Sequence, residues 1–204
     1  MLEDEYLTIR DEHIAKLRVK GSLFIGTASP VSTEAQAQQF IQRISQKYFD
    51  ATHHCYAYQL GFPPNPLYRV SDAGEPSGTA GMPILSVIRG KGLTNICVVV
   101  TRYFGGTKLG KGGLARAYAD CTLLVIEQST IQKNFIVRQL HLDFDYPSIS
   151  SVMGILSTYQ ATIIESNFDQ RAHLVVSLRT SQIENLKRQL LEATAGKIQI
   201  QSAN

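Results

Sequence analysis

The sequence predicts an α+β protein with two domains, an N-terminal domain over residues 1–132 and a C-terminal domain over residues 133–204. In the C-terminal part, strand-period and helix-period segments alternate in the order βαββαβ, a ferredoxin-like plan that closes in about 70 residues. In the N-terminal part, strand-like runs are joined by amphipathic helical runs. The pattern resets at Ser129–Asn134, so we expect the boundary there.

The first half of the N-terminal domain is expected to hold three strands and a helix. Residues 21–28 are typical of a strand. Thr33 is suited to be the N-cap of a helix, because apolar residues follow it with a helical period. Residues 53–60 alternate as a strand does, the prolines of residues 61–66 indicate a loop, and residues 67–72 form a short strand.

The second half of this domain is expected to hold a helix, a buried strand and a longer helix. Apolar residues lie at helical spacing between Ala80 and Gly90. Residues 96–101, ICVVVT, form a continuous apolar run, which is typical of a strand buried on both faces. The longer helix carries its apolar side on Leu114, Ala117, Tyr118, Cys121, Leu124 and Val125.

The C-terminal domain is expected to form one compact unit of four strands and two helices. The strands are predicted at residues 135–146, 161–168, 171–179 and 197–201. The helices are predicted at residues 148–159 and 181–193.

Composition narrows the class of protein. A hydrophobic content of 44% and a charged content of 18% are typical of a globular protein. No apolar run approaches the roughly 18 residues of a membrane span, and the N-terminal residues have no secretory signal, so we expect a cytoplasmic protein. The cysteines are widely spaced among apolar neighbours, which indicates reduced core residues: Cys55, Cys97 and Cys121.

Positive charge is concentrated in the middle of the chain. Residues 76–119 carry six basic residues and no acidic one, so the net charge of +3 comes from this stretch. A local positive field favours an anionic partner. A solvated basic face is the simpler alternative.

The stretch TRYFGGTKLGKGGLARAY, residues 101–118, follows the predicted buried strand and opens the longer helix. Unpaired N–H groups at a helix start bind anions, and glycines let a backbone approach closely. The spacing matches neither the P-loop nor the dinucleotide fingerprint, and glycines that only form a tight turn are the alternative. The nucleic-acid- or anion-binding residues expected here are Arg102, Gly105, Gly106, Lys108, Gly110, Lys111, Gly112, Gly113 and Arg116.

A second helix start lies in DAGEPSGTAG, residues 72–81. Its hydroxyl residues, Ser77 and Thr79, are expected to bind another anion together with the N–H groups that follow them. Capping of the helix by the same hydroxyls is the alternative.

The acids beside the basic block, Asp72 and Glu75, have two interpretations. The favoured one is an ion pair with Arg102 or Arg116, or stabilisation of the helix start. The other is metal binding or acid–base chemistry. Adjacent residues of a strand point to opposite faces, so His53–His54 cannot chelate one ion, and we expect no metal site, no cofactor and no assigned catalytic residue.

Two long motifs, DAGEPSGTAGMPIL and VVVTRYFGGTKLGKGGLARAY, preceded by His53–Cys55, resemble the paired signature of the IMPACT family, and in particular its bacterial YigZ-type members. The resemblance covers the whole chain, since these proteins also carry a small ferredoxin-like C-terminal domain. It implies that the N-terminal domain has the α+β fold of the second domain of a small-subunit ribosomal protein and of domain IV of elongation factor G. Galactokinase-type small-molecule kinases share that fold.

The resemblance implies a role in translation or its regulation, because eukaryotic relatives restrain a kinase that phosphorylates an initiation factor. We therefore expect a nucleic-acid-binding or ribosome-associated protein, with RNA, the ribosome or a protein of the translation machinery as its partner. Tyr103 and Phe104 flank the glycine-rich stretch and are candidates for stacking on bases, with core packing as the alternative. Two other classes stay open: an enzyme acting on a phosphorylated small molecule or nucleotide, and a protein-interaction module.

Overall fold

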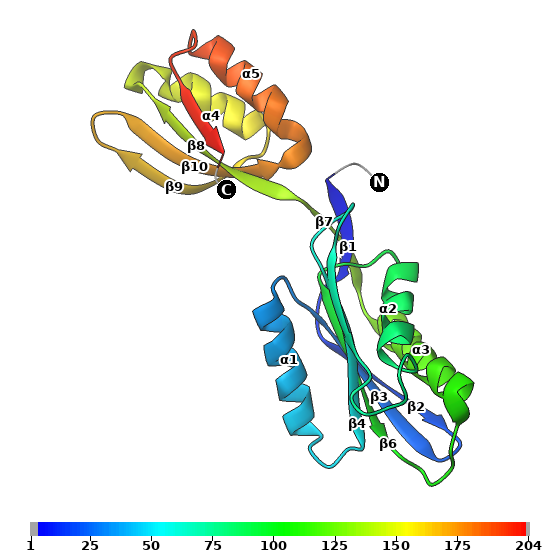
Figure 1. Ribbon diagram of the computed structural model, residues 1–204. Helices are drawn as coiled ribbons and strands as arrows, with labels where there is room; N and C mark the ends of the chain where they lie inside the picture. Colours follow the sequence, from blue (N-terminus) through cyan, green and yellow to red (C-terminus); the bar gives the residue numbers. More distant parts are fainter. Residues whose placement is uncertain (1–3, 203–204) are drawn as a thin grey trace. The chain divides into compact units, whose positions relative to one another are not determined.

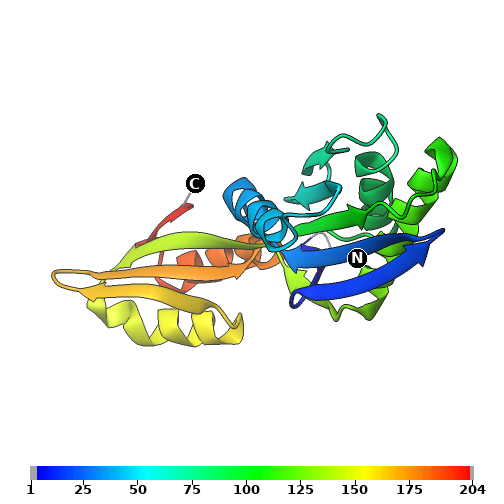
Figure 2. The same cartoon turned by 90° about the horizontal axis from the view of Figure 1, so that it is seen from below.

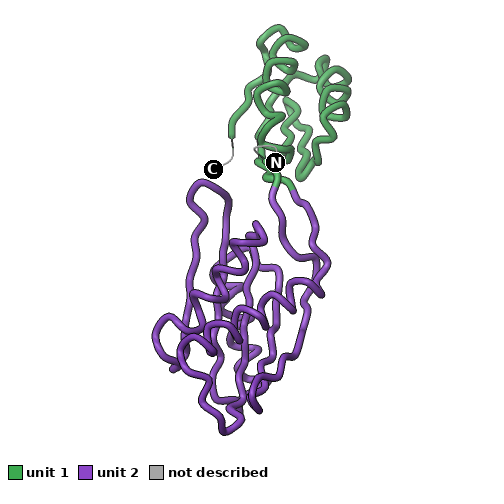
Figure 3. The backbone as a smooth tube through the Cα atoms, turned by 90° about the vertical axis from the view of Figure 1, so that its right-hand side faces the viewer, with its two compact units in different colours: residues 1–5, 135–204 green, residues 6–134 purple. Residues whose placement is uncertain are grey.

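The computed structural model describes residues 4–202 and has a mixed α+β architecture. The chain forms two compact units, one of residues 6–134 and one of residues 4–5 with 135–202 (Figure 3). Each unit is described by itself below. The boundary expected between residues 132 and 133, as a limit between separately folding domains, stays a prediction.

The first unit is built on a five-stranded antiparallel sheet with the order β2-β3-β6-β4-β5. Its strands are β2 (His13–Val19), β3 (Ser22–Pro30), β4 (His53–Leu60), β5 (Leu67–Ser71) and β6 (Ile96–Tyr103). Helix α1 (Glu34–Lys47) covers one face of the sheet, and helices α2 (Gly81–Gly90) and α3 (Gly110–Gln128) cover the other (Figure 1). The elements predicted for residues 21–128 are confirmed in type and order.

Strand β6 lies at the centre of the sheet and contributes to two hydrophobic cores. Val98 and Val100 pack in the core beneath α2 and α3, whereas Cys97 and Val99 pack in the core beneath α1. Its continuous apolar run follows from this position, because both faces of the strand are buried. The prediction for ICVVVT is confirmed.

Helix α1 begins at the residue that the sequence indicated. The hydroxyl of Thr33 accepts a hydrogen bond from the N–H of Gln36 at 3.2 Å, as an N-cap does. Three apolar residues of the helical period, Ala37, Phe40 and Ile44, are buried against the sheet.

A two-stranded ribbon of β1 (Glu5–Ile9) and β7 (Ile131–Phe135) was not expected from the sequence. The predicted strand at residues 135–146 is wrong in its extent, because the chain divides there into β7 and β8 (Val137–Phe144). Ile136 separates them. Its N–H donates to the carbonyl of Asp4 at 2.7 Å and its carbonyl accepts from the N–H of Thr180 at 2.9 Å, so it takes part in neither ladder.

The second unit has the predicted element order βαββαβ. It contains β8, α4 (Ile149–Thr158), β9 (Thr162–Phe168), β10 (Ala172–Arg179), α5 (Ile183–Ala193) and β11 (Gln199–Ser202). The four strands form an antiparallel sheet with the order β11-β8-β10-β9. Alternate residues of β8 and β10, among them Leu140, Leu142, Leu174 and Val176, pack against the two helices.

Candidate anion-binding site

The start of α2 is already occupied by a carboxylate of the chain itself. Asp72 Oδ1 accepts hydrogen bonds from the N–H groups of Ala80 and Gly81, and Oδ2 accepts one from Gly78, each at 2.9 Å. Burial would raise the pKa of Asp72, but the three N–H donors outweigh it and hold the pKa below its ordinary value. The favoured interpretation of Asp72, stabilisation of a helix start, is confirmed.

The hydroxyl residues at this helix start do not cap it. The Thr79 hydroxyl is buried and donates to the carbonyl of Pro76 at 2.6 Å, and no side chain of the residue before α2 caps the helix. The alternative that Ser77 or Thr79 caps the helix is therefore wrong. Asp72, which lies outside the helix, accepts the hydrogen bonds of the helix start instead. Binding of a further anion by Ser77 and Thr79 stays a prediction, and such an anion would compete with Asp72.

At the start of α3, no carboxylate of the described residues takes this place. Within the described residues, its N-cap Leu109 provides no side-chain hydrogen bond and its first turn contains no acid. Gly110, the first residue of the helix, has a φ of +73°, a conformation that favours glycine. No side chain of residues 4–202 accepts from the N–H groups of this first turn, which is the arrangement that attracts an external anion.

A cavity of about 390 Å³ opens beside the start of α3. Its charged residues come from three places in the sequence: Glu75, Arg102 at the end of β6, and Lys108 with Lys111 around the helix start. The remaining lining residues are Pro76, Phe104, Leu109, Gly110 and Leu114. The site therefore combines positive charge with an apolar wall.

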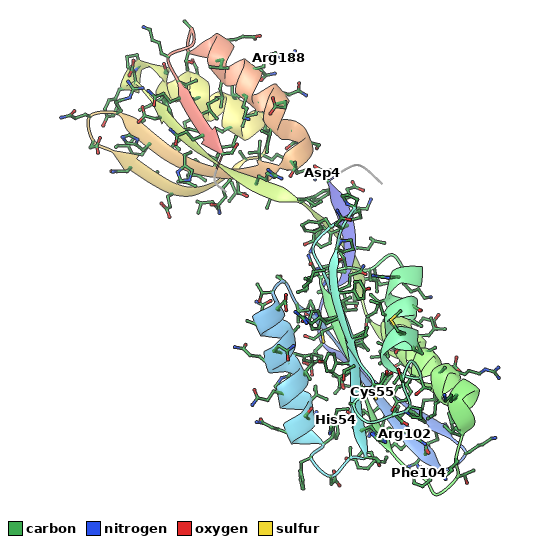
Figure 4. All side chains as sticks on the ribbon, viewed as in Figure 1. Asp4, His54, Cys55, Arg102, Phe104 and Arg188 are labelled. Carbon is green, nitrogen blue, oxygen red and sulfur yellow. The ribbon has the colours of Figure 1, made fainter. Side chains whose placement is uncertain are left out.

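Arg102 lies at the edge of this cavity and is almost fully buried. Its Nη1 lies 2.6 Å from Glu75 Oε1, and the two side chains are 6% and 4% exposed. The guanidinium carbon lies 5.4 Å from the ring centre of Phe24 and 5.4 Å from that of Phe104. Arg102 and Phe104 are labelled in Figure 4. Nη2 donates to the hydroxyl of Ser22 at 3.3 Å, while the buried Nε has no hydrogen-bond partner among the described residues.

The interpretation of Glu75 as the ion-pair partner of Arg102 is confirmed. The same carboxylate oxygen accepts a hydrogen bond from the Tyr118 hydroxyl at 2.8 Å. Cys55 Sγ lies 3.3 Å from that hydroxyl, and burial raises the pKa of Cys55 to about 12. The network holds Arg102 in place, while burial keeps the Cys55 thiol protonated.

The three cysteines are free and buried, as predicted. The two adjacent histidines also lie as predicted, on opposite faces of β4: His53 Nδ1 lies 2.8 Å from the carbonyl of Ala73, and His54 Nδ1 lies 3.2 Å from the hydroxyl of Thr101. Between residues 4 and 202, no group of three or more potential ligands could hold a metal ion.

Of the residues expected to bind an anion, the structure brings Arg102, Lys108, Gly110 and Lys111 to the cavity. Arg116 is exposed on α3 and is not part of the lining. The apolar wall of Pro76, Leu109 and Leu114 was missed. No local signal could have found it, because Leu114 belongs to the helical apolar pattern and Pro76 approaches only through the tertiary fold.

Two glycines of the stretch differ in what they permit. A Cβ on Gly105 would lie 1.9 Å from the carbonyl carbon of Gly21, so only glycine allows this close approach of two loops. A Cβ on Gly112, in the first turn of α3, would meet nothing within 4 Å. The packing of the chain therefore requires glycine at residue 105 and not at residue 112.

Comparison with known proteins matches each of the two units to a known domain family. The Impact N-terminal domain matches residues 20–126, and a domain of unknown function, DUF1949, matches residues 142–197. The chain is 34% identical to IMPACT family member YvyE of Bacillus subtilis, over 96% of this chain and 89% of the relative. It is 31% identical to IMPACT family member YigZ of Escherichia coli, over 89% of this chain and 90% of the relative.

A crystal structure of a hypothetical protein is similar over 100% of this chain and 99% of that chain, with a TM-score of 0.76 and 28% identity. The class of protein is thus a two-part α+β protein with the Impact N-terminal domain. The chain belongs to the IMPACT family, which confirms the resemblance of its motifs. Among the described helices, none is long and apolar enough to cross a membrane.

Proposed function

We propose that this chain is a cytoplasmic nucleic-acid-binding or ribosome-associated protein that acts in translation or its regulation. In this proposal the glycine-rich basic loop and the start of α3 contact phosphates. The fold of the first unit is then that of a ribosomal protein and of domain IV of elongation factor G, and the second unit is ferredoxin-like. RNA or the ribosome is the expected partner.

One observation carries the proposal: the difference between the two helix starts. Asp72 accepts three hydrogen bonds from N–H groups at and just before the start of α2, whereas among the described residues no side chain fulfils this role at α3. Lys108 and Lys111 are exposed beside α3 and form no ion pair among the described residues. A phosphate at α3 would supply the charge that Asp72 supplies at α2.

Two further features favour a nucleic acid as the source of that phosphate. Phe104 is 47% exposed and lines the cavity, so its ring is available to stack on a base. Gly112 leaves open space above the first turn of α3, which lets a bulky phosphodiester approach the backbone. Family membership supports the role in translation, because the resemblance implies that role for eukaryotic relatives.

Fluorescence anisotropy with a labelled single-stranded RNA tests the proposal. If three or four phosphates are neutralised, log K falls with log salt with a slope of roughly −2 to −3. The variant Lys108→Glu/Lys111→Glu/Arg116→Glu is expected to abolish binding. A matched control, Arg138→Glu/Arg188→Glu/Lys197→Glu, changes three exposed basic residues of the second unit and is expected to bind normally.

Equal loss of binding in both variants would point to general charge rather than to the start of α3. Absence of binding by the unaltered protein would sink direct recognition of single-stranded RNA. Tight binding to a protein partner that survives high salt would then favour the protein-interaction module.

An enzyme acting on a phosphorylated small molecule or nucleotide is the second candidate. The cavity of about 390 Å³ is in the size range of small-ligand sites, and the Glu75 carboxylate lines it. A thermal-shift screen with nucleotides and sugar phosphates tests this function. Saturable stabilisation by one compound, with turnover that Glu75→Gln removes while binding persists, would favour the enzyme.

A further inference from the structure

Strand β2, at one edge of the five-stranded sheet, presents a row of basic residues. Lys16 and Arg18 occupy alternate positions of the strand, and Lys20 follows in the turn to β3. All three are exposed, and none of their side chains forms an ion pair or hydrogen bond with another described residue. We call these three residues the β2 strip.

The strip lies on a defined face of the sheet. The alternate residues Ala15, Leu17 and Val19 pack into the core beneath α2 and α3. Lys16 and Arg18 therefore point to the opposite face, because side chains alternate along a strand. Figure 2 shows β2 and β3 side by side, and there Lys16 is paired with Ile25 and Arg18 with Leu23.

Two acidic residues nearby have partners of their own, while the exposed Asp11, which precedes Glu12, has none among the described residues. Glu12, which precedes β2, forms an ion pair with Arg43 of α1. Asp50 accepts a hydrogen bond from the hydroxyl of Tyr103 at 2.7 Å. None of these acids forms an ion pair with the strip, so its side chains are available to an external partner.

The strip runs toward the proposed phosphate site. Lys20 precedes Gly21, whose backbone lies directly against Gly105 of the glycine-rich loop. Ser22 joins the two loops as well, since its hydroxyl accepts a hydrogen bond from the N–H of Gly105 at 3.2 Å. The end of the strip and the start of the glycine-rich loop thus adjoin at one end of the sheet.

We propose that a single-stranded nucleic acid bound at the start of α3 passes around this end of the sheet and continues along β2 on the opposite face, with its phosphates on Lys16, Arg18 and Lys20. Alternate residues of a strand are about 6.6 Å apart, which is comparable with the spacing of phosphates along an extended single strand. The inference rests on the proposed function and extends it, because it names a second contact surface and an extended single strand as the partner.

Lysine on an edge strand also has a simpler explanation, since it prevents edge-to-edge aggregation. The two explanations differ in their dependence on the length of the ligand. A ligand that fills only the start of α3 does not reach the strip. A longer one reaches it, so the strip contributes only to the binding of long strands.

The test compares labelled oligo-uridines of about 4 and about 16 nucleotides, by anisotropy at several salt concentrations. The strip variant is Lys16→Glu/Arg18→Glu, and the matched control is Arg138→Glu/Arg188→Glu. For the long strand, the strip variant is expected to weaken binding about tenfold or more at low salt. Its salt slope should become shallower by about 0.7 for each lost contact. For the short strand, less than a twofold change is expected.

The variant Lys108→Glu/Lys111→Glu separates the failure of this inference from the failure of the proposed function. Unchanged long-strand binding by the strip variant, with loss in the Lys108/Lys111 variant, overturns the inference and leaves the proposed function standing. Absence of binding by the unaltered protein overturns this inference together with direct recognition of single-stranded RNA in the proposed function. Equal loss of short and long strands in the strip variant overturns the idea of a continued path.

A second variant keeps the test decisive if the strip variant aggregates. Lys16→Gln/Arg18→Gln keeps the edge polar and is expected to show the same shallower salt slope for the long strand. A salt slope equal to that of the unaltered protein would indicate that the strip only prevents edge-to-edge aggregation of β2. If poly-glutamate bound as tightly as the long oligo-uridine, the inference of a nucleic-acid partner would be wrong, and an acidic protein segment would be the better candidate.

Discussion

Glu75 and Arg102 form an ion pair of 2.6 Å in a place where both side chains are almost inaccessible to water. The pair joins the turn before α2 to the end of the central strand β6 and lies at the edge of the candidate site. Glu75 also accepts a hydrogen bond from the hydroxyl of Tyr118 on α3. One carboxylate therefore links the turn before α2, the end of β6 and α3. Its removal leaves the Arg102 charge without its partner.

We therefore expect Glu75→Ala to destabilise the first unit by about 3–5 kcal/mol, the cost of an uncompensated buried charge. The double variant Glu75→Leu/Arg102→Met removes both charges and is expected to be closer in stability to the unaltered protein. Urea unfolding followed by circular dichroism measures both. Equal destabilisation in the single and double variants would contradict the role of the pair.

Asp72→Asn is expected to lower the free energy of unfolding by about 0.5–2 kcal/mol at pH 7, as loss of a helix cap does. The pKa of Asp72 is lowered in the folded protein, so its ionised form stabilises the fold above the pKa of the unfolded chain. That stabilisation is lost as the pH falls through the lower, folded-state pKa. Denaturation at pH 7 and at pH 3 should show the difference between the proteins shrinking in acid, whereas a constant difference would argue against ionisation of Asp72.

Gly105→Ala and Gly112→Ala form a matched pair within one stretch. The added methyl at residue 105 collides with the backbone of Gly21, so a loss of at least about 2 kcal/mol is expected. The methyl at residue 112 meets open space, and alanine favours a helix, so stability is expected to be equal or higher by about 0.5–1 kcal/mol. If a phosphate approaches there, RNA binding should weaken in Gly112→Ala despite the gain. Thermal unfolding and anisotropy measure the two effects, and unchanged affinity would remove Gly112 from the site.

The cysteines are expected to resist thiol reagents at pH 8 in the folded protein. Burial raises the pKa of both Cys55 and Cys121 to about 12, and it also raises the pKa of Cys97, so few thiolates are present. All three should react once urea unfolds the chain. Rapid labelling of one cysteine in native buffer, identified by mass spectrometry, would contradict this expectation.

The sequence predicted best the elements whose signal is local. The apolar run of β6 and the capped helix α1 carry their own evidence, because burial on two faces and a helical period are visible in a few residues. Strand β1 lacked such a signal. It pairs with β7, more than 120 residues away in the sequence, and only the folded chain shows that partner.

The candidate site was predicted in part for the same reason. Lys108, Gly110 and Lys111 are neighbours in the sequence, so their charge and flexibility could be read together. The wall formed by Pro76 with Leu114 depends on how α2 and α3 pack, and the basic residues of β2 become relevant only because Gly21 meets Gly105. Contacts between residues so far apart in the sequence cannot be predicted from the spacing of residues along the chain.

The central position of β6 has a consequence for the order in which the protein can fold during its synthesis. The neighbours of β6, strands β3 and β4, are completed well before it leaves the ribosome. At about 5–20 residues per second, the hairpins β2–β3 and β4–β5 each wait for seconds with an open edge toward the missing strand. The nascent chain is thus exposed to wrong strand pairing for that interval, and the arrival of residues 96–103 converts two separate hairpins into one sheet.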